Sequence, residues 1–186
     1  MLKTRTKDNF RWFILGLLFI ATTILYIDRS ALGILAPDLQ KSIGWSEEQY
    51  GYINTAFMIA YAICFMIMGT IIDRIGTKKG YMISIGIWSI ATAAHSLAGR
   101  WIGFAIARFA LAAGQSGNFP SAIKAVAEWF PKKERALATG IFNSGTNVGA
   151  LIAPIVVPGI ADKWGGEMAF SLTGAVGLRW IIFWFA

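Results

Sequence analysis

The sequence predicts an all-α integral membrane protein with six transmembrane helices. Of its 186 residues, 56% are hydrophobic and only 15% are charged, whereas soluble proteins carry about 25% charged residues. The apolar residues form long runs, and a helix that crosses a membrane needs about 20 of them. The single cysteine excludes a disulfide-stabilised secreted domain, and the apolar content excludes a disordered chain.

The chain divides into a short cytoplasmic tail, 1–11, and a six-helix transmembrane domain, 12–186. The expected spans are 12–36, 50–72, 79–97, 101–130, 136–160 and 167–186. A cleaved signal peptide is the alternative for the first run, but that run is too long and further spans follow it. The last run reaches Ala186 without a polar tail. We therefore expect the N-terminal half of a longer protein, with the C-terminal half absent.

Local signals set the boundaries of these spans. Ser46 and Gln49 have the spacing of a capping box, which predicts that the second helix begins there. Gly76 is expected to end that helix. Pro131 ends the fourth span, because proline lacks the N–H that an interior helical turn needs.

The distribution of positive charge predicts the orientation in the membrane. With the N-terminus inside, ten of the 17 Lys and Arg residues fall in cytoplasmic segments and three fall on the opposite side. Cytoplasmic loops are enriched in these residues, so we expect both termini in the cytoplasm and the protein in the inner membrane. The basic residues lie between apolar runs rather than on one polar face, so the net charge of +7 predicts no nucleic-acid partner.

A pattern of glycine and charged residues joins the second and third spans: Gly69, Asp73, Arg74, Gly76 and Lys78. Gly69 lies one turn before Asp73 and would allow another helix to approach closely. A carboxylate at a helix C-terminus costs about 0.3–1 kcal/mol unless a cation or another helix N-terminus compensates it, so Asp73 needs a partner such as Arg74. The alternative is that this charged pair only marks the cytoplasmic side.

Asp28 and Arg29 lie within the first span, where an ionisable residue is costly and therefore indicates function. Successive helix residues point in different directions, so the two side chains are not expected to pair. Arg29 offers a planar fork of donors that matches a carboxylate, and Tyr26 shares part of its face. The alternative is that Arg29 extends to the outer surface, where Asp28 neutralises it.

The fifth span carries a polar stripe, because Asn143, Thr146 and Asn147 are spaced three and four residues apart. Such donors and acceptors suit sugar hydroxyls. The alternative is hydrogen bonding between helices beside Gly145 and Gly149, whose small size permits close packing.

These motifs resemble those of a known family. The 69–79 segment resembles the signature loop of the major facilitator superfamily. Four further segments resemble the sugar-acid members of its anion:cation symporter group, and above all the hexuronate transporter type: YIDRSAL (26–32), GNFP (117–120), EWFPKKERA (128–136) and GIFNSGTNVG (140–149). Superfamily members consist of two six-helix halves, each made of inverted three-helix repeats, with substrate bound near the midplane. The resemblance covers essentially the whole chain as the first half.

The resemblance implies that Arg29 binds a substrate carboxylate and that Tyr26 and Tyr61 contribute hydroxyl groups. Many relatives carry a glutamate where this chain has Gln115, and that glutamate takes part in proton coupling. An amide cannot titrate, so ion coupling, by H⁺ or Na⁺, rests on Asp28 alone or works differently, while Gln115 still contributes to binding. Arg108 lies seven residues before Gln115 and is assigned, with the loop residues of 69–78, to a conformational gate.

The leading functional hypothesis is cation-coupled symport of an organic anion, most of all a hexuronate or related sugar acid, by alternating access. A complete path would require the C-terminal half or a homodimer partner. The alternatives are a non-transporting half-bundle that acts as a scaffold, and a carrier of another organic anion or phosphate. The sequence holds no metal-ligand cluster, nucleotide-binding loop or nucleophile–base pair, so we expect no enzyme and no cofactor.

Overall fold

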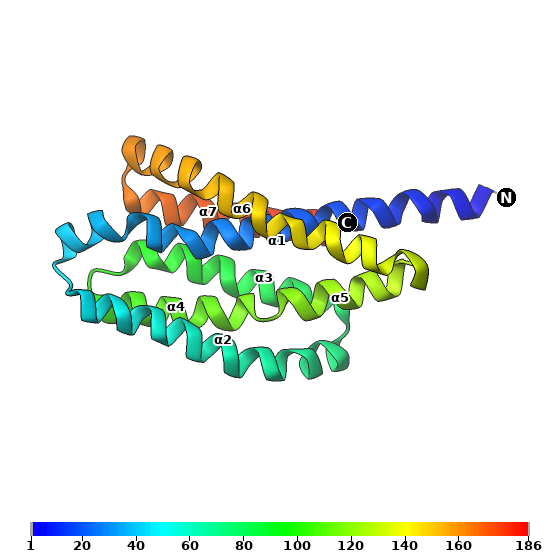
Figure 1. Ribbon diagram of the computed structural model, residues 1–186, viewed down its shortest axis with the longest axis horizontal. Helices are drawn as coiled ribbons and strands as arrows, with labels where there is room; N and C mark the ends of the chain where they lie inside the picture. The colour runs from blue at the N-terminus through cyan, green and yellow to red at the C-terminus, as the bar shows by residue number, and fades with distance from the viewer. Residues whose placement is uncertain (1, 186) are drawn as a thin grey trace.

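The structure is a computed structural model that describes the backbone of residues 2–185 and the side chains of residues 10–185. It is all-helical, and its helices run side by side along one long axis (Figure 1). The elements are α1 (Leu2–Ile43), α2 (Glu47–Ile75), α3 (Thr77–Ala94), η1 (His95–Leu97), α4 (Trp101–Gln115), α5 (Asn118–Trp129), η2 (Lys132–Glu134), α6 (Arg135–Trp164) and α7 (Gly166–Phe185).

The helix α1 is longer than the first predicted span. It begins at Leu2, so the predicted tail, 1–11, is helical from residue 2, and the side chains of residues 1–9 lie outside the described part of the chain. It also continues through Pro37 to Ile43. A proline inside a helix removes one hydrogen bond without forcing the helix to end, provided that its neighbours tolerate the kink.

The start and end of α2 follow the local signals. The Ser46 hydroxyl accepts from the Gln49 backbone N–H, and the Gln49 side chain accepts from the Ser46 N–H, which completes the predicted capping box. At the other end, the N–H of Gly76 donates to the Ile72 carbonyl, and Gly76 has φ of 85°. That left-handed backbone costs a glycine nothing, so α3 can begin one residue after α2 ends.

The fourth predicted span is two helices rather than one. α4 ends at Gln115 and α5 begins at Asn118, continuing along the bundle (Figure 1). In a continuous helix the nitrogen of Pro120 would have to donate to the carbonyl of Ser116, and proline cannot do so. Gly117 sits at the break against Ser84 of α3, where a side chain would collide. The prediction of one unbroken helix over 101–130 was therefore wrong.

Four described helices are long and apolar enough to cross a membrane by length and composition: those over Phe10–Ile43, Glu47–Ile75, Lys132–Trp164 and Gly166–Phe185. α3 and the interrupted α4–α5 pair are not among them. The structure thus has six helical columns, of which four are continuous helices of this kind. Many large apolar side chains point outward, including Met66, which is 83% exposed, and Ile155, which is 75% exposed.

Close helix packing fixes the position of α1 in the bundle. Gly145 and Gly149 of α6 lie against α1, and a Cβ at these positions would come within 2.6 Å of the Phe19 carbonyl oxygen and 2.5 Å of the Thr23 carbonyl oxygen. On another side of α1, Trp180 of α7 donates its indole N–H to the Leu17 carbonyl at 2.9 Å. These contacts hold the 17–26 segment of α1, directly before Asp28 and Arg29, between α6 and α7.

Candidate functional site

The Arg29 guanidinium turns into the bundle and lies among three aromatic rings. Its Cζ atom is 5.2 Å from the ring centroid of Tyr26, 5.1 Å from that of Phe57 and 4.8 Å from that of Tyr61. Phe57 and Tyr61 are one turn apart on α2, and their rings are stacked. Cation–π contacts of this kind contribute about 0.5–2 kcal/mol each. Tyr26 and Tyr61 thus present ring faces to the cation, and the contact of their hydroxyls with a substrate stays a prediction.

Gln115 fixes the orientation of Arg29. Its side chain is fully buried, and its Oε1 accepts from Arg29 Nε at 3.0 Å. Its Nε2 donates to the backbone carbonyl of Leu25 at 3.2 Å. Both ends of the amide are therefore used, which assigns the oxygen to the Arg29 side. Among residues 10–185 no other hydrogen bond to the Arg29 guanidinium is present, so its two Nη atoms are available to a ligand.

Arg108 lies beside Arg29, away from the 69–78 loop with which the sequence analysis grouped it. Its Nη2 donates to the backbone carbonyl of Arg29 at 3.0 Å, and its Cζ atom is 5.3 Å from the ring centroid of Phe57. The side chain is buried, and its Nε has no hydrogen-bond partner among the described residues. Phe57 therefore contacts both guanidinium groups. We name Tyr26, Arg29, Phe57, Tyr61, Arg108 and Gln115 together the Arg29 site.

Asp28 faces away from the Arg29 site, as the spacing predicts. It is 2% exposed and lines a cavity of about 110 Å³ between α1, α6 and α7, whose other walls are Thr173 and apolar side chains. The hydroxyls of Thr92 and Thr173 border the carboxylate, but they donate to the carbonyls of Trp88 and Ala169. Within residues 10–185 neither carboxylate oxygen has a hydrogen-bond partner, and no ion pair joins Asp28 to Arg29.

The polar stripe of α6 faces out of the bundle. Asn143 and Asn147 are exposed and Thr146 is partly exposed, whereas Gly145 and Gly149 are buried against α1. The glycine pair and the stripe thus occupy different faces of α6. In the described part of the chain, no hydrogen bond connects the stripe to the Arg29 site.

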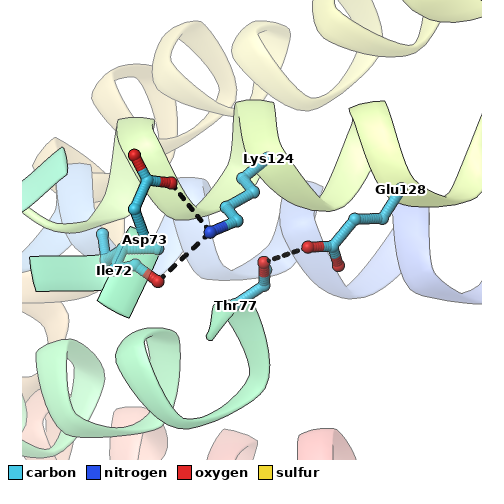
Figure 2. Close-up of polar contacts among 5 residues, drawn as sticks. All are labelled: Ile72, Asp73, Thr77, Lys124 and Glu128. Carbon is cyan, nitrogen blue, oxygen red and sulfur yellow. Dashed lines mark hydrogen bonds and ion pairs between the residues drawn. The ribbon is translucent and has the colours of Figure 1, made fainter. Parts of the chain in front are cut away.

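Asp73 finds its partner on α5 rather than at Arg74. Its Oδ1 lies 2.8 Å from Lys124 Nζ, which also donates to the Ile72 carbonyl at 3.3 Å (Figure 2). One lysine therefore compensates the carboxylate and the partial negative charge at the C-terminus of α2. The neighbouring side chains behave differently: Arg74 is exposed, and Lys78 donates to the Phe185 carbonyl at 2.8 Å.

A second contact joins α5 to the first turn of α3. The Thr77 hydroxyl donates to Glu128 Oε1 at 2.6 Å (Figure 2), which brings a carboxylate to the positive end of that helix. Lys124 and Glu128 are one turn apart on α5, so they hold the two helix ends at once. We name Asp73, Thr77, Lys124 and Glu128 the α2–α3 clamp. The spacing of Lys124 and Glu128 was visible in the sequence, but their partners were not.

Gly69 does not make the close approach that was expected of it. A Cβ built at this position meets no atom within 4 Å in the described part of the chain. The prediction that another helix packs there is therefore not met by any of the helices α1 to α7.

Comparisons with known proteins agree with the motifs. The model of the Major Facilitator Superfamily matches residues 18–186. The chain is 39% identical to a galacturonate transporter of Dickeya chrysanthemi over 176 residues, which are 94% of this chain and 50% of that protein. It is 37% identical to the hexuronate transporter of Escherichia coli (strain K12), over 97% of this chain and 42% of that protein. The chain spans about half the length of these curated relatives.

Solved structures share the fold. A bacterial homologue of the human lysosomal transporter Spinster, in an inward-facing conformation, superposes with a TM-score of 0.84 over 94% of this chain and 42% of that one, at 23% sequence identity. This likeness concerns the helical arrangement alone. The family match over residues 18–186 is the stronger observation, and it shows that the chain belongs to the major facilitator superfamily.

Proposed function

We propose that this chain is the N-terminal half of a symporter for an organic anion, most specifically a hexuronate or a related sugar acid. The relatives named above are transporters of galacturonate and hexuronate, and they match nearly the whole chain. In this proposal the complete transporter contains a C-terminal half or a second copy, spans the inner membrane and has both termini of this chain in the cytoplasm.

The proposal rests on the orientation of the Arg29 guanidinium and on its Nη atoms, which are unpartnered among the described residues. The guanidinium is turned into the bundle, oriented through Nε by Gln115 and flanked by aromatic rings, while its two Nη atoms have no partner among residues 10–185. Two Nη donors in one plane match the two oxygens of a carboxylate. Arg108 adds a buried cation beside the partly buried Arg29, and no carboxylate of the described residues forms an ion pair with either arginine. The site therefore favours an anion.

Sugar hydroxyls require neutral donors and acceptors beside the charged group. We assign these contacts to the hydroxyls of Tyr26 and Tyr61 and to the polar stripe of Asn143, Thr146 and Asn147, which lies open on α6. In superfamily members the substrate lies near the midplane between two halves. The exposed stripe is placed to complete a cavity with a second half.

We assign ion coupling to Asp28. Its cavity is lined by Thr173 and apolar side chains, and a Na⁺ site needs several oxygen ligands, so this environment favours a proton over Na⁺. Asp28 interacts electrostatically with Arg108, whose Nη2 donates to the Arg29 carbonyl, so a change of charge at Asp28 reaches the Arg29 site through Arg108. Gly69, Asp73, Arg74, Gly76 and Lys78 then belong to the gate at the other end of α2.

Uptake by the complete transporter in proteoliposomes tests this assignment. We expect labelled glucuronate or galacturonate to accumulate against a gradient, and Arg29→Ala to abolish both binding and uptake. Asp28→Asn should abolish accumulation while leaving equilibrium binding within about twofold, because the carboxylate faces away from the ligand. Uptake that is insensitive to Arg29→Ala would remove the assignment.

A further inference from the structure

An apolar groove runs between α3 and α4 at the end of the bundle away from the N-terminus. Its volume is about 490 Å³, and every lining residue is apolar. Ala91 and Ala107 are buried on its floor, while Ile90, Leu97 and Ile106 stand on its rim and are 62%, 87% and 66% exposed. The small side chains of the floor leave a channel that no side chain of residues 10–185 fills.

The length of this groove corresponds to one leaflet of a bilayer. Along α3 and η1 it extends from Ile87 to Leu97, which is about 15 Å at roughly 1.5 Å per residue. The hydrocarbon core of a membrane is about 30 Å thick. Trp101 begins α4 at the same end, and tryptophan is enriched at the level of the lipid headgroups. The groove therefore runs from the headgroup level to the middle of the membrane.

One positive side chain lies at the headgroup end of the groove. Arg100 lies in the turn between Ala98 and Gly103, which both line the groove, and it is exposed. No ion pair or hydrogen bond of its side chain is present within the described residues, and α4 has neither a side-chain cap nor an acidic residue in its first turn. The free N–H groups and positive pole of that helix end add to the arginine. Three acidic side chains of the same end, Asp38, Asp162 and Glu167, line a separate pocket on the other side of Ala98 and do not line the groove.

From this combination we propose that the α3–α4 groove binds a phospholipid with an anionic headgroup, such as phosphatidylglycerol. One acyl chain lies in the groove, and the phosphate contacts Arg100 and the N-terminus of α4. An apolar groove alone would accept any acyl chain, but Arg100, which has no ion pair among the described residues, selects for a negative headgroup. This site is separate from the Arg29 site and does not depend on what that site transports.

Photo-cross-linking tests the proposal. The protein is reconstituted in phosphatidylcholine vesicles that contain a small fraction of either phosphatidylglycerol or phosphatidylcholine with a diazirine in the acyl chain, and the labelled peptides are mapped. We expect phosphatidylglycerol to label residues 87–110 about fivefold more than phosphatidylcholine does, and Arg100→Gln to remove that preference. Lys163→Gln is the matched control, since Lys163 is exposed at the same end but outside the groove.

A second variant tests the channel separately from the charge. Ala94→Phe places a ring in the groove and should lower the labelling of 87–110 by both lipids, whereas Ala62→Phe, at an exposed position of α2, should not. Circular dichroism verifies that each variant is folded. Equal labelling by the two lipids, labelling spread evenly over the apolar surface, cross-links to a second copy of the chain in place of lipid, or an unchanged preference in Arg100→Gln would each overturn the proposal.

Discussion

The Arg29 site and the α2–α3 clamp both gather charged side chains, but they compensate these charges in opposite ways. In the clamp, Lys124 lies 2.8 Å from Asp73, and the Asp73 side chain is 73% exposed. In the Arg29 site, the two arginines contact aromatic rings, an amide oxygen and a backbone carbonyl, and no carboxylate of the described residues joins them.

This difference in charge compensation indicates that the Arg29 site, and not the α2–α3 clamp, can bind a ligand. An exposed ion pair is already satisfied by its own partner and by water, so it contributes to positioning rather than to binding. Arg108 is buried and Arg29 is partly buried, and neither has a carboxylate at ion-pair distance among the described residues, so a bound anion would restore solvation that both have lost. The Arg29 site is therefore incomplete in the way that a binding site is, whereas the clamp is complete.

Replacement of the Arg29 guanidinium by a lysine ammonium group should have the largest effect on the affinity for substrate. Arg29→Lys keeps the positive charge but loses the planar donors and the bond from Nε to Gln115. Charge-assisted hydrogen bonds contribute about 1.5–3 kcal/mol, so the affinity for glucuronate should fall at least about tenfold. Isothermal titration calorimetry measures this. Arg179→Lys, the same change at an exposed position of α7, should leave the affinity unchanged.

If Arg29→Lys bound glucuronate as tightly as the unchanged protein does, charge alone would be sufficient. The assignment of bidentate carboxylate recognition would then be wrong.

A carboxyl group at position 115 should give Arg29 an ion-pair partner within the protein, as Lys124 has in the α2–α3 clamp. In Gln115→Glu, the protonated side chain can still donate to the Leu25 carbonyl and accept from Arg29 Nε. Once ionised, it loses the bond to Leu25 and pairs with Arg29, which competes with the substrate anion. Binding of glucuronate should therefore weaken by about tenfold as the pH rises through the titration of the new carboxyl group, and recover at lower pH.

The pH series needs two references. The unchanged protein should show no such loss over the same interval, and Gln115→Asn, a neutral but shorter amide, should weaken binding equally at every pH. A pH-independent affinity in Gln115→Glu would contradict the competition between the introduced carboxylate and the substrate.

Removal of the ring shared by the two arginines should have a smaller effect. Phe57→Leu keeps an apolar side chain but removes the π face that contacts both Arg29 and Arg108. At about 0.5–1 kcal/mol for the contact with Arg29, the arginine assigned to the substrate, glucuronate affinity should fall about two- to fivefold. Phe65→Leu, one turn beyond Tyr61 and in contact with neither arginine, is the matched control. Equal losses in both variants would point to α2 packing instead of cation–π contact.

Local sequence signals predicted where helices begin and end better than they predicted the contacts between helices. The capping box at Ser46 and the left-handed glycine at position 76 lie where expected, because both depend on residues within one turn. The opposite directions of Asp28 and Arg29 also follow from helical spacing alone. The break at 116–117 escaped prediction although Gly117, Asn118 and Pro120 signal it, because the apolar residues on both sides of it favoured a single span.

The contacts that define both regions join residues far apart in the chain. Lys124 reaches Asp73 across 51 positions, and Gln115 reaches Arg29 across 86. Phe57 resembled any other apolar residue of a membrane helix until α2 was placed beside α1 and α4. The contact of Arg108 with the Arg29 carbonyl was unpredictable for the same reason: spacing fixes the face of a helix but not the neighbour that it meets. Its role in a gate stays a prediction.

The smallest effect should come from the clamp, where a double-mutant cycle of Asp73→Ala and Lys124→Ala isolates the ion pair. Because Asp73 is largely exposed, the coupling energy for unfolding in detergent should be about 0.2–1 kcal/mol. It should decrease between low and high salt, since ions screen exposed charges. Thr77→Val serves as the reference, because Thr77 is buried and its bond to Glu128 depends less on salt. A coupling above about 2 kcal/mol that is insensitive to salt would mean that the pair is shielded from water, and the clamp would then belong with the Arg29 site instead of in contrast to it.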